Sequence, residues 1–152
     1  MKRTILCIAV AACGSLFAQD TPAGCTDSMV QGTYAVTISG TAPAAAVVPG
    51  SAALPGTLQP FIGLVLITFD GKGTFTQLDW IKGTLSPYVP ARPAKGVYKV
   101  NPDCTGTSTI SLPVAPFEIV TQFIVTDNGA GSIFIVATPA SNMTMGSSRR
   151  IR

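Results

Sequence analysis

The sequence predicts an all-β fold, an eight-stranded antiparallel up-and-down barrel, with a β-sandwich as the alternative. Three observations lead to this prediction. Eight segments alternate apolar and polar side chains or are continuously apolar, as strands are. Several are joined by glycine-containing hairpin turns such as Asp70-Gly71-Lys72-Gly73. No segment has the pattern of a helix longer than one turn, so eight strands in sequence order favour a closed barrel.

The first eighteen residues are expected to be a signal peptide rather than part of the domain. Lys2 and Arg3 precede an apolar run in residues 5–17, which is too short to span a membrane. Cleavage after Ala18 leaves a single domain, residues 19–152, that is secreted or periplasmic. The alternative is a lipoprotein anchored at Cys13, because V-A-A-C resembles a degenerate lipid-attachment sequence.

Cleavage after residue 18 removes two of the four cysteines and leaves Cys25 and Cys104. Two cysteines in an exported chain most often form a disulfide with each other. The alternative is a pair of free, buried thiols. A disulfide would tie the segment before the first strand to the start of the fifth.

The first half of the domain alternates strands with proline-rich segments. A helical turn is expected in residues 25–31 and a strand in residues 32–39. Residues 41–60 carry four prolines and no charge, which predicts a long Ala/Pro-rich loop. A highly apolar strand at 61–69 is followed by its hairpin partner at 74–85. Three prolines in residues 86–94 predict another loop.

The second half supplies five further strands, expected at residues 95–101, 104–112, 117–126, 132–138 and 142–151. Openings of the form Gly-x-aromatic at Gly32, Gly73 and Gly96 are interpreted as recurrent hairpin chemistry, because their spacing is uneven. Three strands, 61–69, 117–125 and 132–136, are apolar on both faces. Their outer faces are therefore expected to be covered by the 41–60 loop or by another copy of the chain, in a homo-oligomer.

Three motifs carry a resemblance: G-T-Y at 32–34, F-D-G-K-G-T-F at 69–75 and G-V-Y-K-V-N-P-D-C-T-G-T at 96–107. Together they resemble a group of short secreted bacterial β-barrel proteins of uncharacterised function. More loosely, a half-turn followed by Gly-x-aromatic is similar to the lipocalin opening, with Tyr34 in place of tryptophan, and the barrel is similar to that of allene oxide cyclase and dirigent-type proteins. These resemblances imply an architecture and no catalytic residue.

Composition excludes several classes of function. The chain has no histidine, which removes histidine-based catalysis and most transition-metal sites. Paired cysteines would leave no thiol nucleophile. Beyond residue 18 there are eight basic and seven acidic residues, a net charge of +1. Neither a nucleic acid nor an anionic surface is expected as the main partner at that charge. Neither a cofactor, a metal nor a stable membrane span is expected.

The remaining candidates for chemistry are Tyr34, Asp79 and Glu118. Two carboxylates facing into a barrel would form an acid/base pair. The interpretation we favour is that Asp79 and Glu118 point outward or pair with Lys82 or Lys99. The expected function is therefore a non-catalytic binding or structural module, with an apolar small molecule as its ligand. The alternatives are an isomerase- or cyclase-like enzyme and a self-assembling cell-envelope protein.

Overall fold

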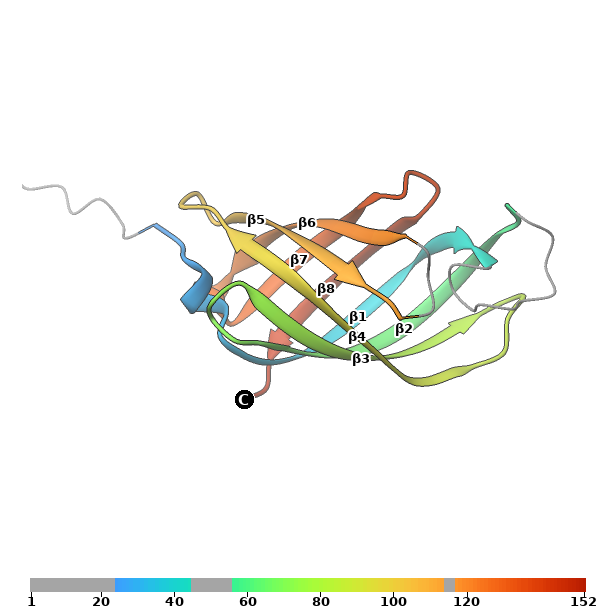
Figure 1. The fold of residues 1–152 in the computed structure, drawn as a ribbon, viewed down its shortest axis with the longest axis horizontal. Helices are drawn as coiled ribbons and strands as arrows, with labels where there is room; N and C mark the ends of the chain where they lie inside the picture. The colour runs from blue at the N-terminus through green and yellow to red at the C-terminus, as the bar shows by residue number, and fades with distance from the viewer. Residues whose placement is uncertain (1–23, 45–55, 114–116) are drawn as a thin grey trace, which may run out of the picture.

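The computed structural model describes residues 24–44, 56–113 and 117–152 of the chain. In these residues eight strands form a closed antiparallel barrel, in which each strand pairs with the next and the last pairs with the first (Figure 1). The predicted barrel is confirmed, and the sandwich alternative is wrong. The strands are β1 (Gly32–Pro43), β2 (Leu58–Phe69), β3 (Thr74–Gly83), β4 (Val89–Val100), β5 (Thr105–Ser111), β6 (Glu118–Thr126), β7 (Gly131–Thr138) and β8 (Met143–Arg150).

Two short 3-10 turns accompany the strands. The first, η1 (Asp27–Val30), confirms the helical turn expected in residues 25–31. The second, η2 (Asp127–Gly129), lies in the turn between β6 and β7. Within the described ranges no helix is long and apolar enough to cross a membrane. The expected signal peptide, residues 1–18, and the alternative lipid attachment at Cys13 lie outside the described residues.

The loop expected at residues 41–60 is shorter than the sequence indicated. β1 and β2 continue into it from both sides, and Thr41 pairs with Pro60. A proline fits there because β3 pairs with β2 only from Phe61 onward, so Pro60 has a neighbouring strand on one side alone. The middle of the expected loop, residues 45–55, lies outside the described residues.

The loop expected at residues 86–94 is wrong for most of its length. β4 already begins at Val89 and includes Pro90 and Pro93. The reason is the same, since β5 pairs with β4 only from Lys95 onward. The first half of β4 is therefore bonded to β3 alone, and a missing N–H can face the unpaired side.

Phenylalanine rings inside the barrel lie opposite glycines on the neighbouring strands. A Cβ at any of these glycines would collide with the ring. Glycine therefore provides the space into which a ring fits, an arrangement known to stabilise sheets. The interpretation of Gly96 as a hairpin residue is wrong for that reason. The pairs are Gly96 with Phe75, Gly106 with Phe123, and Gly146 with Phe134.

One end of the barrel, here called the η1 end, is filled by side chains. Val30 of η1 packs into a buried cluster with Phe75 and Tyr98. Phe69 meets Tyr98 edge to face, with ring centroids 4.9 Å apart. The opposite end, here called the far end, carries the connections that follow β1, β3, β5 and β7 (Figure 1).

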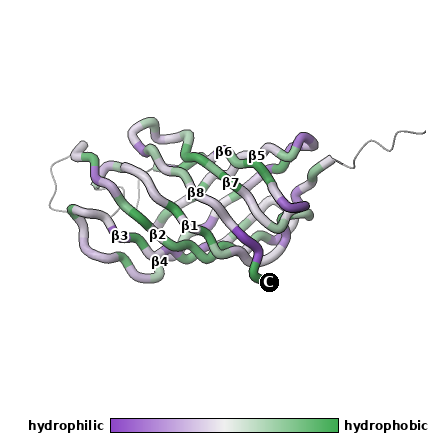
Figure 2. The backbone as a smooth tube through the Cα atoms, turned by 180° about the vertical axis from the view of Figure 1, so that it is seen from behind, coloured by the Kyte–Doolittle hydropathy of each residue, from purple (hydrophilic) through white to green (hydrophobic). Residues whose placement is uncertain are grey.

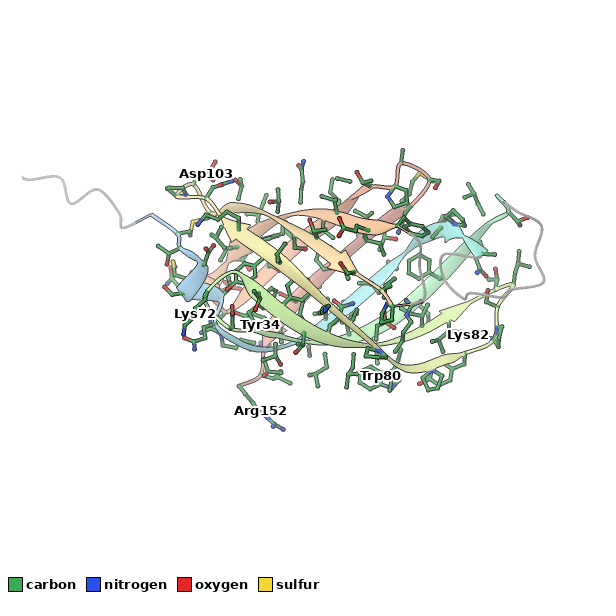
Figure 3. The ribbon with its side chains drawn as sticks, viewed as in Figure 1. Tyr34, Lys72, Trp80, Lys82, Asp103 and Arg152 are labelled. Atoms are coloured by element: carbon green, nitrogen blue, oxygen red, sulfur yellow. A yellow bond between two sulfur atoms is a disulfide. The ribbon has the colours of Figure 1, made fainter. Side chains whose placement is uncertain are left out.

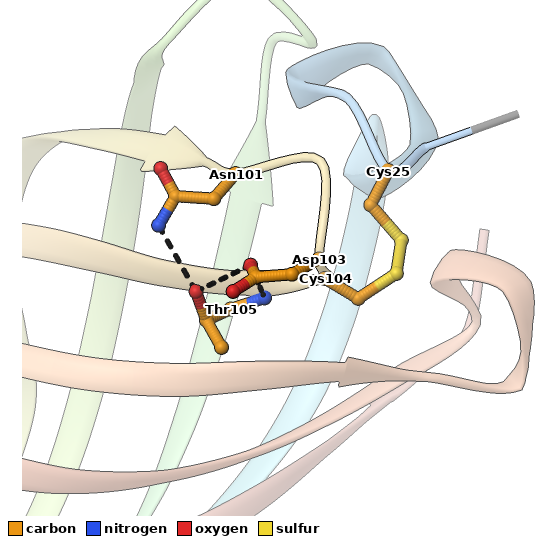
Figure 4. The surroundings of a disulfide bond; sticks show 5 residues. All are labelled: Cys25, Asn101, Asp103, Cys104 and Thr105. Carbon is orange, nitrogen blue, oxygen red and sulfur yellow. Dashed lines mark hydrogen bonds between the residues drawn. A yellow bond between two sulfur atoms is a disulfide. The ribbon is translucent and has the colours of Figure 1, made fainter.

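A pair of cysteines fastens η1 to the barrel. The sulfur atoms of Cys25 and Cys104 lie at disulfide-bonding distance, with the Cα atoms 4.9 Å apart (Figure 4). The turn that presents Cys104 is held by Asp103, whose Oδ1 accepts hydrogen bonds from the backbone N–H and hydroxyl of Thr105. The pairing expected from the sequence is therefore present as a disulfide-distance pair.

Candidate functional site

The candidate site is a cavity inside the barrel, between the packed η1 end and the far end. Its volume is about 140 Å³. Most of the lining side chains are apolar and come from nearly every strand, because inward positions recur at every second residue. Examples from four different strands are Val36, Val65, Ile110 and Phe134.

Asp79 lines this cavity, contrary to the interpretation favoured from the sequence. It is 4% exposed, and it lies in phase with the buried Phe75, Gln77 and Ile81 on β3. Side chains two residues apart share a face of a strand, so Asp79 must point inward when these three do. Lys82 is three residues away and therefore lies on the outer face, where it cannot reach the carboxylate.

The partner of Asp79 is Arg92, which faces it directly across the β3–β4 pair. Arg92 Nε lies 2.9 Å from Asp79 Oδ1, and Nη2 lies 2.9 Å from Oδ2. Their side chains are only 5% and 12% exposed, so the ion pair is largely shielded from water. The register shifts between Asp79 and Ile81, and Ala91 has a φ of 42°. Irregularities of this kind change the direction in which side chains point, and this one lies next to the Asp79–Arg92 pair.

Two pairs of hydroxyl side chains in the lumen bond to each other across neighbouring strands. The hydroxyls of Ser108 and Thr121 are 2.7 Å apart, and those of Ser132 and Ser148 are 2.8 Å apart. Throughout the described part of the chain, no buried side-chain nitrogen or oxygen lacks a hydrogen-bond partner. The amide of Gln77 is a further polar group in the lining of the cavity.

Tyr34 lies at the η1 end, where its hydroxyl and ring contact residues that hold the two 3-10 turns in place. Its hydroxyl donates to the carbonyl of Gly129 and accepts from Arg150, whose Nη2 lies 2.8 Å away. Arg150 Nη2 also donates to the carbonyl of Met29 in η1. The guanidinium carbon lies 5.4 Å from the centroid of the Tyr34 ring. Tyr34 and Arg150 thus hold both 3-10 turns against the first and last strands.

Glu118 lies outside the barrel, as expected. It is an exposed residue at the start of β6, and the hydroxyl of Ser111 lies 3.4 Å from its Oε1. Tyr34 and Asp79 therefore both line the cavity, with Tyr34 at its η1 end, whereas Glu118 lies on the outer face. The structure does not bring the three sequence candidates together, and no three metal-ligating residues cluster within the described ranges.

Gln59 at the far end was missed because it falls in the segment expected to be a loop. It is fully buried, its Nε2 donates to the Ser86 hydroxyl at 2.6 Å, and its Oε1 accepts from the backbone N–H of Leu85 at 2.7 Å. Gly83 leaves the space for this amide, since a Cβ there would collide with it. Gln59 therefore ties the β3–β4 connection to the start of β2.

Comparisons with models of protein families, with curated proteins and with solved structures find no match for this chain. The resemblances drawn from the sequence motifs therefore stay predictions beyond the barrel itself.

Proposed function

We propose that this protein is an exported binding module that holds one small, uncharged, apolar molecule in the lumen of its barrel. The observation that carries the proposal is the cavity, whose lining side chains are mostly apolar. A ligand there gains free energy by leaving water and by contact with the walls.

The cavity volume sets the size of the ligand. An engineered protein cavity of about 150 Å³ lined by aliphatic and aromatic side chains binds benzene. A cavity of about 140 Å³ therefore suits a molecule of one ring, such as a simple arene or a cyclic hydrocarbon. A long-chain fatty acid is too large for it, and its carboxylate would be costly to bury among these side chains.

A thermal-shift titration with benzene, toluene and indole, and with palmitate as the large anionic comparison, tests the proposal. Single-ring ligands are expected to stabilise the protein, by about 2.7 kcal/mol at about 100 times their dissociation constant. Palmitate is expected to have no effect.

A matched pair of variants locates the binding. Val136 lines the cavity, and its neighbour Ala137 is exposed on the outer side of the same strand. Val136→Phe is expected to abolish the shift by filling the cavity, and Ala137→Phe to leave it intact. The proposal is wrong if Val136→Phe still binds the ligand, or if no single-ring compound raises the unfolding temperature of the wild-type protein.

One observation favours a second candidate, an isomerase- or cyclase-like enzyme. Asp79 presents a carboxylate beside the cavity, where it is the single acidic residue among the described lining residues. A carboxylate there can accept a proton from a bound molecule as a general base. Arg92 competes for the same oxygens, which makes binding the first candidate. Turnover of a bound ligand that is lost in Asp79→Asn, with ligand affinity retained, would establish the enzyme.

A further inference from the structure

The outer surface of five adjacent strands, β7, β8, β1, β2 and β3, forms a one-sided apolar face. The strand registers align its outward side chains in rows that run across the barrel. Its central apolar side chains are strongly exposed: Leu64 60%, Ile62 64%, Met145 63% and Ile135 55%. We call this surface the β7–β3 face. Figure 2 shows the same side, with β2 hydrophobic along much of its length.

A groove runs along the middle of the β7–β3 face. Its floor is β1, whose outward residues Ala35 and Thr37 are small, and its walls include Leu64 and Trp80 on one side and Ser147 on the other. Tyr88 also lines it and is 56% exposed. Tryptophan and tyrosine join an apolar body to a polar tip, which suits the boundary between hydrocarbon and water.

The charges on this face have one sign. Lys82 on β3 and Arg149 on β8 are the outward-facing charged side chains among the described residues of these five strands. They lie toward opposite ends, because Lys82 pairs with Ile62 toward the far end and Arg149 pairs with Ala35 toward the η1 end. Arg152 follows at the η1 end, and Figure 3 shows Arg152 and Trp80 projecting from the barrel.

This charge pattern decides between two occupants of the face. A second copy of the chain, docked through the same face by a two-fold axis, would place cationic ends against cationic ends, because the described residues of these five strands present no outward carboxylate. An anionic lipid surface offers negative headgroups to the cations and an acyl boundary to the apolar rows. The opposite side of the barrel has fewer exposed large apolar side chains, Val97 on β4 and Ile124 on β6, and its other exposed residues include Thr107 on β5 and Lys95 and Lys99 on β4.

We propose that the β7–β3 face is a docking surface for an anionic lipid bilayer. The barrel lies on its side against the headgroups. Ile62, Leu64 and Met145 enter the acyl boundary, while Lys82 and Arg149 contact the headgroups. This surface is separate from the lumen, and the proposal for it does not depend on the binding function proposed above.

Vesicle co-sedimentation of the full mature chain tests the proposal. Vesicles of phosphatidylcholine alone are compared with vesicles that also contain phosphatidylglycerol. The protein is expected to sediment with the anionic vesicles, to be released by salt, and to stay in solution with phosphatidylcholine alone.

Variants on the two sides of the barrel provide the controls. Leu64→Glu and the double variant Lys82→Glu/Arg149→Glu are each expected to weaken binding to anionic vesicles about tenfold or more. Thr107→Glu, on the opposite side, adds one negative charge, as Leu64→Glu does, and is expected to retain at least most of the binding. Met145→Ser, a milder change at an exposed position, keeps the test valid if a charged variant does not fold.

Two results would overturn the proposal. One is a wild-type protein that does not sediment with anionic vesicles. The other is a stable dimer, measured by light scattering at micromolar concentration, that Leu64→Glu converts to a monomer, because the face would then be occupied by a second copy. Equal loss of vesicle binding in Thr107→Glu would likewise contradict the assignment to this face.

Discussion

Among the residues that the structure describes, the Asp79–Arg92 pair is the one place where the interior holds opposite charges at hydrogen-bonding distance. A bidentate guanidinium–carboxylate contact compensates much of the cost of removing both groups from water. Removing one partner leaves the other charge buried without its counter-ion. Removing one partner therefore destabilises the fold, whereas replacing both partners with apolar side chains of similar size costs little stability.

We expect Asp79→Ala to lower the free energy of unfolding by about 3–5 kcal/mol, because Arg92 would be left without its carboxylate. Urea denaturation followed by circular dichroism measures the loss. The double variant Asp79→Leu/Arg92→Met, which removes both charges, is expected to recover most of it. A single variant as stable as the wild type would show that the pair is solvated rather than buried.

Asp27 makes the stability of the η1 end depend on pH. Burial of its carboxyl by itself would raise the pKa, but the hydrogen bond from the backbone N–H of Val100 and the contact with Lys99 outweigh this, so the pKa of Asp27 is lowered. A lowered native pKa stabilises the fold above the unfolded value of about 3.9, and that stabilisation is lost as the pH falls through the native pKa.

The wild-type protein is accordingly expected to lose stability as the pH is lowered below about 4, and Asp27→Asn to lose less over the same interval. Denaturant midpoints measured between neutral and strongly acidic pH would show the difference. Asp70 and Asp103, whose pKa values are also lowered, first of all by hydrogen bonds from Lys72 N–H and the Thr105 hydroxyl respectively, contribute in the same direction. Parallel acid profiles for wild type and Asp27→Asn would contradict the assignment.

At the scale of elements, neighbouring strands are fitted to each other by glycine–phenylalanine pairs. A ring from one strand occupies the space above a glycine on the next, so these pairs also help to specify register. A one-residue slip would move every ring to the outer face of the barrel.

We expect Gly106→Ala to destabilise the protein by about 1–3 kcal/mol, because the added methyl group meets the Phe123 ring. Thr107→Ala, one residue along and pointing outward, is the matched control and is expected to change stability by less than about 0.5 kcal/mol. Thermal unfolding of both variants tests this. In Gly106→Ala/Phe123→Leu the smaller side chain is expected to relieve the collision with the ring but not the one with the Lys99 carbonyl oxygen, 2.6 Å from the same Cβ position, so stability recovers in part. No recovery at all would show that the contact with the Lys99 carbonyl accounts for the loss.

For the whole molecule, a bond between Cys25 and Cys104, which lie at disulfide distance, would close a covalent loop with a sequence separation of 79 residues. A cross-link over such a loop restricts the unfolded chain and stabilises the fold by about 4 kcal/mol. Cys25→Ala/Cys104→Ala is expected to lower the free energy of unfolding by that order, measured by urea denaturation without reductant. An unchanged midpoint, with no free thiol detected in the wild type, would contradict this expectation.

The sequence alone predicted the strand count, the barrel and the cysteine pairing. Strand alternation and turn residues can be recognised within a short segment, and the cysteines can simply be counted. The sequence did not predict the start of β4, since whether a proline is tolerated depends on how far the neighbouring strand extends. Arg92 lies in the part of β4 that was expected to be a loop, so it was overlooked. Without Arg92 as a partner, Asp79 was expected to point outward, which is wrong. The glycine–phenylalanine pairs and the cavity depend on cross-strand register, which no single segment contains.

The closure of the barrel has a consequence for how the chain folds. The ladder between β1 and β8 joins the first and last strands, and Arg150 on β8 completes the contacts of η1. These are the contacts most distant in sequence, and folds dominated by such contacts form slowly, in roughly milliseconds to seconds. Until β8 arrives, β1 has an open edge beside the apolar β2. A chain of this kind therefore depends, during the interval between synthesis and closure of the barrel, on protection from association with other strands.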